Sequence, residues 1–155
     1  MLSTYLDYQD WLVNQMESLH ASSPQLNEES LCEAIYEIGN RLMNGRYDWD
    51  DPKYHLSESW SNSSSEEGRY IVGFYNDHTG IELCLPGIYH TLKDFGPTNY
   101  KQIEMFITFT LAHERSHRSH GDICKYHTNE EHDNHPNEIR AQRAGYEAVL
   151  QFLNN

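Results

Sequence analysis

The stretch of this 155-residue chain with the clearest capacity for chemistry is an H-E-x-x-H motif, formed by His113, Glu114 and His117. In an α-helix, residues four apart lie on one face, about 6 Å apart along the axis, so two imidazoles at this spacing can share one metal ion. Glu114 is rotated about 100° from His113, which keeps it out of the coordination sphere but within reach of a metal-bound water. The motif therefore predicts a zinc site with a carboxylate base beside the activated water.

A zinc hydrolase needs a third protein ligand, and several residues after the motif can supply it. Glu138 is one candidate, because it falls in the first turn of the next predicted helix, whose small-residue face could pack on the motif-bearing helix. His120 lies on the same helix face as the histidine pair, but about 7 Å along the axis from its midpoint, which is far for a shared ion. Asp122 and the histidines of the following loop are further alternatives.

The motif needs a helix to carry it, and the sequence predicts one over about residues 99–119. Thr98 or Asn99 is placed to cap its N-terminus, and Gly121 to end it in a left-handed conformation. Its predicted apolar face consists of Ile103, Phe106, Ile107, Thr110 and Leu111.

A polar loop is predicted for residues 121–136, followed by a last helix over 138–153 that Asn137 caps. Small residues recur below Glu138 on one face of this helix, at Ala141, Gly145 and Ala148. Because small side chains let two backbones come close, this face is expected to pack on the H-E-x-x-H helix.

The rest of the chain predicts an α+β domain spanning residues 1–155. Helices are expected over 3–20 and 28–44, followed by an irregular segment over 46–68. The acidic residues at 48–51 lack the spacing of a calcium loop and indicate a solvated turn. Residues 70–75 and 81–85 predict a β-hairpin, and 88–92 a short third strand or a turn. Residues 1–69 thus supply N-terminal helices and a loop, and residues 70–155 the sheet and the zinc helices.

Composition restricts the partners and the compartment. With 24 acidic and 11 basic residues, the net charge is −13, which argues against direct binding to nucleic-acid phosphates. Three scattered cysteines without a C-x-x-C pair favour a reducing compartment. The first residues lack a secretory signal, and no apolar run reaches the about 20 residues of a membrane span, so a cytoplasmic protein without a membrane partner is expected.

The segment Phe109-Thr110-Leu111-Ala112-His113-Glu114, followed by His117, resembles the F-T-L-A-H-E-x-x-H motif of ImmA/IrrE-type metallopeptidases, a gluzincin-like family. Asn137-Glu138-x-x-Ala141 resembles the second motif of that group, and the resemblance covers roughly residues 70–153. The chain departs from it at Arg115-Ser116, where the family usually has Leu-Gly. A charged Arg115 predicts that this side of the helix meets solvent or a carboxylate.

The resemblance implies a zincin-like fold, in which N-terminal helices precede a small antiparallel sheet, the zinc helix and a helix that supplies Glu138 as third ligand. It also implies cleavage of an intracellular protein, often a helix-turn-helix transcriptional regulator. In this interpretation Zn²⁺ is held by His113, His117 and Glu138, and Glu114 acts as general base. Candidate donors to the oxyanion or substrate are His127, His132, His135, Tyr126 and Tyr146.

Two other interpretations remain open from the sequence. The acidic charge also fits a small binding or inhibitor protein, including a nucleic-acid mimic, whose zinc site is structural or vestigial. The remaining interpretation is a metallopeptidase-like domain whose cleft binds a peptide without cutting it. Function that survives replacement of Glu114 by Gln distinguishes a binder from a peptidase.

Overall fold

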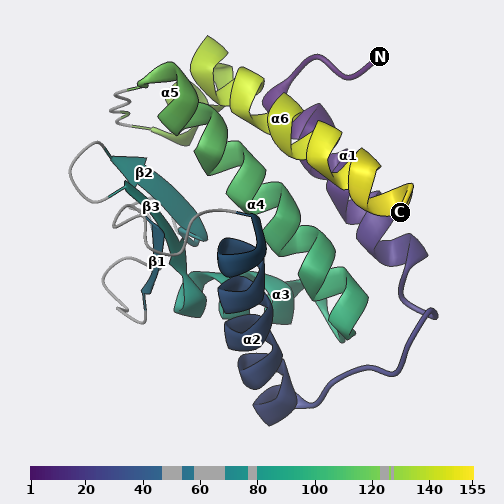
Figure 1. Cartoon of the computed structure of the whole chain (residues 1–155). Coiled ribbons are helices and arrows are strands. Elements are labelled where there is room, and N and C mark those ends of the chain that lie inside the picture. The colour runs from purple at the N-terminus through teal and green to yellow at the C-terminus, as the bar shows by residue number, and fades with distance from the viewer. Residues whose placement is uncertain (47–53, 58–68, 77–79, 123–125, 127) are drawn as a thin grey trace.

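The computed structural model describes residues 1–46, 54–57, 69–76, 80–122, 126 and 128–155. Within these ranges the chain is α+β and mostly helical, with one small sheet (Figure 1). The elements in chain order are α1 (Tyr5–Ser18), α2 (Glu28–Arg46), β1 (Tyr54–Ser57), β2 (Gly73–Asn76), β3 (Gly80–Cys84), α3 (Leu85–Phe95), α4 (Tyr100–His120), α5 (Asn129–Asn134) and α6 (Pro136–Leu153).

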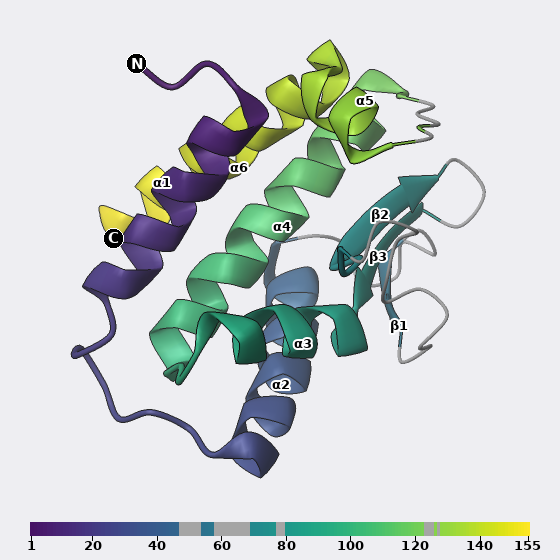
Figure 2. The same ribbon diagram turned by 180° about the vertical axis from the view of Figure 1, so that it is seen from behind.

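Helix α4 lies at the centre of the molecule, with α1 and α6 on one side and the sheet, α2 and α3 on the other (Figure 2). Thirteen of its 21 residues are buried, because it is covered on more than one side. Asn99 and Gln102 form a capping box at its start, and Gly121 ends it with a φ of 64°. The predicted cap and stop of the motif-bearing helix are confirmed.

The first two helices, which the sequence predicted, pack on α4 through apolar stripes. In α1 the buried residues are Tyr8, Leu12 and Met16, and Thr4 caps the helix through a capping box with Asp7. In α2 the stripe consists of Leu31, Ile35, Ile38 and Leu42. One hydrophobic cluster joins these residues to buried side chains of β3, α3, α4 and α6.

Helix α6 approaches α4 closely through its small residues. Ala141 and Gly145 are buried, and a Cβ atom built on Gly145 would lie 2.9 Å from three atoms of the Phe109 ring. The cap of this helix differs from the prediction. His135 is the N-cap, and its ring Nδ1 accepts a hydrogen bond from the backbone N–H of Asn137, so Asn137 already lies in the first turn.

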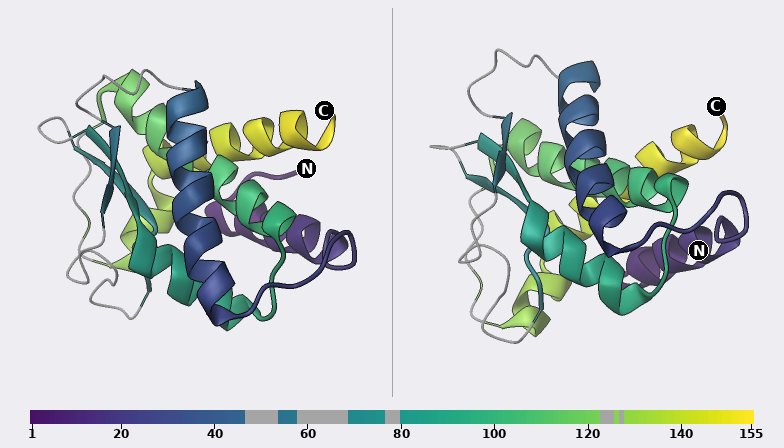
Figure 3. Two further views of the ribbon diagram at one scale, coloured as in Figure 1. Left: turned by 60° about the horizontal axis from the view of Figure 1, so that its bottom comes forward. Right: turned by 90° about the horizontal axis from the view of Figure 1, so that it is seen from below.

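The sheet has the strand order β1-β3-β2, with β2 at one edge. Strands β2 and β3 pair antiparallel, with Phe74 opposite Glu82, so the predicted hairpin is confirmed. The predicted small antiparallel sheet is present as this pair, and β1 adds a parallel pairing with β3 that the sequence did not predict. The strand at 54–57 lies in the segment predicted to be irregular, and its pairing partner is distant in sequence. Figure 3 shows the sheet on one side of α4, with α1 and α6 on the other.

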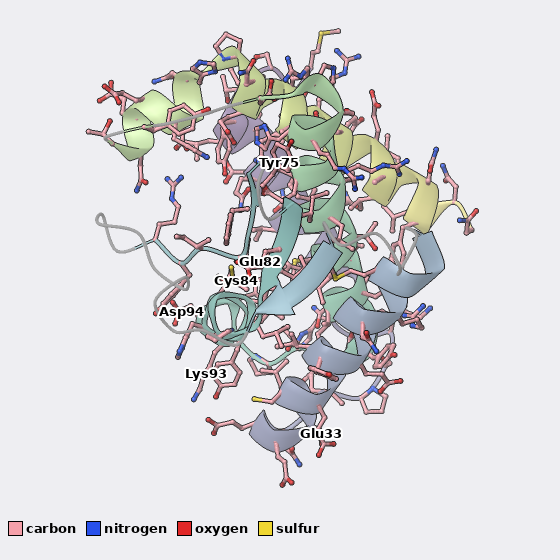
Figure 4. All side chains as sticks on the ribbon, turned by 60° about the vertical axis from the view of Figure 1, so that its left-hand side comes forward. Glu33, Tyr75, Glu82, Cys84, Lys93 and Asp94 are labelled. Carbon is pink, nitrogen blue, oxygen red and sulfur yellow. The ribbon has the colours of Figure 1, made fainter. Side chains whose placement is uncertain are left out.

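Two predicted non-helical segments contain helices. Residues 88–92, expected as a strand or turn, belong to α3, which begins at Leu85 because a proline is tolerated in the first turn of a helix. Ile88 and Leu92 are buried, whereas Lys93 and Asp94 lie on the exposed side (Figure 4). The short helix α5 interrupts the predicted loop over 121–136, and Thr128 caps it.

Within the described ranges, no helix is both long and apolar enough to cross a bilayer. The predicted turn at 48–51 and, apart from residues 46 and 54–57, the predicted irregular segment over 46–68 lie outside the described residues.

The contact between Gly145 and Phe109 gives a first prediction. Gly145→Ala should lower the free energy of unfolding by about 1–2 kcal/mol, because overpacking at a buried contact exceeds the roughly 0.5–1 kcal/mol that Ala gains over Gly in a helix. Denaturant unfolding measures the change.

Phe109→Leu makes room for the new methyl group, so the double variant should be more stable than the sum of the two single changes predicts. A Gly145→Ala protein more stable than the wild type would show that the two helices do not depend on this glycine.

Candidate metal centre

Two imidazoles and one carboxylate converge where α4 meets the start of α6. His113 and His117 lie one turn apart on α4, and Glu138 lies in the first turn of α6. All three residues are buried, and their ligand atoms lie within 4.8 Å of one another. Among the described residues this is the one such group of three, and it could hold a metal ion.

The distances within the group are close to those between ligands of one metal ion. The two Nε2 atoms are 3.3 Å apart, Glu138 Oε1 lies 3.1 Å from His113 Nε2, and Glu138 Oε2 lies 3.0 Å from His117 Nε2. Ligand bonds of about 2.0–2.1 Å around a tetrahedral ion place neighbouring ligand atoms about 3.3 Å apart. The side chains therefore need little rearrangement to share one ion.

The other nitrogen of each imidazole is held by a hydrogen-bond acceptor. His113 Nδ1 lies 2.8 Å from Gln142 Oε1, and His117 Nδ1 lies 2.9 Å from Asp122 Oδ2, which also pairs with Arg140. An acceptor at Nδ1 favours the proton there and leaves the lone pair on Nε2. When the imidazoles are neutral, both lone pairs would point into the centre, where a bound cation would take the place of the protons that face Glu138.

The same kind of contact shows what two of the alternative third ligands do instead. Asp122, one of the alternatives for the third ligand, instead orients His117. His120 was another alternative. Its ring Nδ1 lies within hydrogen-bond distance of the backbone carbonyl of Ser116, at the partly exposed end of α4. Gln142 was missed in the sequence, although it lies one turn after Glu138 on the same face of α6.

The charge balance of the group is set by Glu138. Burial raises the pKa of this carboxyl, but hydrogen bonds from His113, His117 and His132 outweigh burial and hold the pKa far below its usual range. Burial lowers the pKa of His117, yet its bond to Glu138 and the nearby negative charges raise it to about 9. The site thus favours positive charge, whether it is carried by protons or by a metal ion.

Glu114 lies beside the three ligands and outside their immediate contact. Its Oε2 is 4.0 Å from His113 Nε2, and the residue is 7% exposed. Burial raises the pKa of its carboxyl, although the neighbouring imidazoles lower it. Strand β2 fixes the stem of this side chain, because a Cβ on Gly73 would lie 3.3 Å from Glu114 Cγ.

Two of the predicted donors reach the centre. Tyr126 donates its hydroxyl to Glu138 Oε2 at 3.0 Å, and His132 Nε2 lies 3.0 Å from Glu138 Oε1. Asp133 orients His132 through a 2.9 Å contact to Nδ1, and Arg69 binds the same carboxylate through both terminal nitrogens, at 2.9 and 3.1 Å.

The structure does not bring His135 or Tyr146 to the metal-binding group. His135 caps α6 and packs its ring edge against Tyr126. Tyr146 packs between the rings of Tyr8 and Trp11 in the helical core. His127 lies outside the described residues.

A cavity of about 480 Å³ opens beside the metal-binding group. It is lined by one face of α4, by residues 69–75, by the first turns of α6, and by residues between α4 and α6 that include Tyr126 and His132. Helix α1 also lines it, through Tyr5, Gln9 and Leu12, although the sequence had left this helix without a role. Tyr75 lies on the hairpin that borders this cavity (Figure 4).

The geometry predicts that the purified chain binds one divalent ion with the group formed by His113, His117 and Glu138. His113→Ala or Glu138→Ala should weaken binding by more than the about 10–100-fold that loss of an outer hydrogen-bond partner causes, because a ligand itself is lost. Equilibrium dialysis against zinc, followed by elemental analysis, measures stoichiometry and affinity.

The matched control is His120→Ala, which removes a histidine from the same helix and should leave the affinity unchanged. Full occupancy in Glu138→Ala would remove this residue from the ligand set.

Comparisons of the chain with models of known protein families, with curated proteins and with solved structures found no match.

Proposed function

We propose that this protein is a zinc-dependent metallopeptidase that cleaves a peptide bond in an intracellular protein. The observation that carries the proposal is a buried carboxylate, Glu114, lying 4.0 Å from His113 Nε2 beside a three-ligand group that opens into a cavity. Three protein ligands leave a fourth position free, as in catalytic zinc sites, whereas structural sites usually have four protein ligands.

The donor set favours zinc among the common ions. Two imidazoles and one carboxylate suit Zn²⁺, whereas magnesium and calcium prefer sites made of oxygen ligands alone. When bound, zinc would supply Lewis acidity and lower the pKa of a water molecule to near neutrality.

Glu114 is the residue we assign as general base. Its buried position raises the pKa of its carboxyl, which makes it a stronger proton acceptor than an exposed glutamate. After accepting a proton from water it can donate the same proton to the leaving amine. Gly73 of β2 lies against the stem of Glu114, where a larger side chain would contact it.

Tyr126 and His132 are the candidates for stabilising the oxyanion. Both line the cavity, and both have a polar atom 3.0 Å from Glu138, on the side away from α4. His132 is oriented by Asp133, which leaves its Nε2 directed at the site. A small shift from Glu138 toward bound substrate would let either group donate to a developing negative charge.

A peptide is the favoured substrate because of the strand beside the cavity. In the described part of the sheet β2 is an edge strand, and residues of this strand line the cavity. An extended peptide can add to such an edge through backbone hydrogen bonds, which would run it past Glu114. The zincin-like order of sheet, zinc helix and glutamate helix supports the same proposal, and a transcriptional regulator is the substrate that the family resemblance suggests.

A second candidate follows from the net charge of −13. A strongly acidic chain fits a protein that binds a basic partner without cutting it, with the metal ion in a structural role. The two candidates differ in whether Glu114 is needed.

Glu114→Gln should retain zinc and lose peptide hydrolysis by about 10²–10⁴-fold, because the amide cannot accept the proton. Mass spectrometry of a peptide library, incubated with zinc-loaded protein, measures cleavage. Glu147→Gln, an exposed carboxylate-to-amide change on α6, is the control and should cleave like the wild type.

Undiminished cleavage by Glu114→Gln would exclude Glu114 as the base. If the wild type cuts no peptide and Glu114→Gln retains partner binding, the binding function is favoured instead.

A further inference from the structure

We propose that Gln142 is a positioning residue that couples docking of α1 to metal binding, so that the N-terminal helix is part of the metal centre. The proposal rests on the metal-binding group and does not depend on hydrolysis. Three contacts of one buried amide carry it.

Gln142 is 1% exposed and its two amide atoms face different elements. Its Oε1 lies 2.8 Å from His113 Nδ1 on α4. Its Nε2 donates to α1, at 3.1 Å to the backbone carbonyl of Tyr5 and at 3.0 Å to Gln9 Oε1. A single side chain of α6 thus joins a metal ligand to the first turns of α1.

The backbone carbonyl of Tyr5 determines which way the side-chain amide of Gln142 is oriented. A carbonyl can only accept, so the NH₂ of Gln142 must face α1 and its oxygen must face His113. The imidazole must then carry its proton on Nδ1, which leaves the lone pair on Nε2 for the metal. With α1 displaced, the amide is free to turn over and donate to Nδ1, and this favours the tautomer that cannot bind a metal at Nε2.

Helix α1 contacts the same site through a ring. The Tyr5 ring lies edge-on to the rings of His113 and His132, with centroid separations of 6.4 and 5.1 Å. Helix α1 therefore contacts both His113, a metal-binding residue, and His132, which bonds to Glu138. By linkage, if docking of α1 strengthens metal binding, metal binding must strengthen docking of α1 by the same factor.

A second buried glutamine offers a matched control. Gln102 Nε2 donates to the backbone carbonyl of Met16 at the other end of α1, at 2.7 Å, and its Oε1 accepts from the backbone of Asn99. In both residues, replacement by Glu keeps the acceptor and removes the donor to α1. Only Gln142 contacts a metal ligand.

The experiment measures amide hydrogen exchange in α1 with and without zinc, together with zinc affinity. Zinc stabilises the whole fold, so the relevant quantity is the protection that α1 gains beyond the gain of α2. In the wild type α1 should show such an excess. Gln142→Glu should bind zinc and lose the excess, because its carboxylate still accepts from His113 but cannot donate to α1.

Gln142→Leu removes both contacts and should weaken zinc binding by about 10–100-fold, the usual effect of losing an outer hydrogen-bond partner. Gln102→Glu should keep both the wild-type affinity and the excess protection of the first turns of α1. Gln9→Leu, at a partly exposed position, should also reduce the extra protection of α1. Circular dichroism checks that each variant folds.

Equal zinc-dependent protection of α1 and α2 in the wild type would overturn the proposal. So would an undiminished excess in Gln142→Glu, or unchanged zinc affinity in Gln142→Leu. If the wild type binds zinc but α1 gains no more protection than α2, only the coupling is refuted. If the wild type binds no zinc, the metal centre is refuted as well.

Discussion

The close contact between α4 and α6 is the interaction on which the rest of the structure depends. Gly145 lets the α6 backbone reach the ring of Phe109, and two turns earlier the same approach delivers Glu138 to the imidazoles of α4. A bulkier residue in this seam would separate the ligands before it disturbed either helix. Helix packing therefore brings the ligands together, and Asp122 and Tyr126, which lie outside the helices, add hydrogen bonds to two of them.

Burial explains why the group is so closely bonded. A carboxylate that is 3% exposed is unfavourable unless it is paired and hydrogen-bonded. Glu138 is satisfied by His113, His117, His132 and Tyr126, and two of these partners are themselves oriented by Asp122 or Asp133. Such a network favours one arrangement of its side chains, because each hydrogen bond restricts the next. A metal ion would replace the shared protons at its centre.

Sequence reasoning succeeded where the physical cause lies within a few residues. The cap at Asn99, the stop at Gly121, the small-residue face of α6 and the β2–β3 hairpin are set by local chemistry. It failed where the cause is distant. The parallel pairing of β1 with β3 joins segments more than twenty residues apart, and nothing in residues 54–57 indicates their partner.

The same distinction applies to the site. The spacing of His113 and His117 specifies a shared ion locally, whereas the roles of Tyr5, Gln9 and Gln142 arise only when α1 folds onto α6. Tyr146 and His135 had suitable side chains for the oxyanion, but one packs in the core and the other caps a helix. Residue type alone could not separate them from Tyr126 and His132.

The central claim is that two imidazoles and one carboxylate hold a single ion, and X-ray absorption spectroscopy of the zinc-loaded chain tests it most directly. The account predicts one zinc environment with nitrogen and oxygen ligands at about 2.0–2.2 Å and scattering from two imidazole rings. A sulfur ligand at about 2.3 Å, or scattering from fewer than two imidazoles, would contradict it.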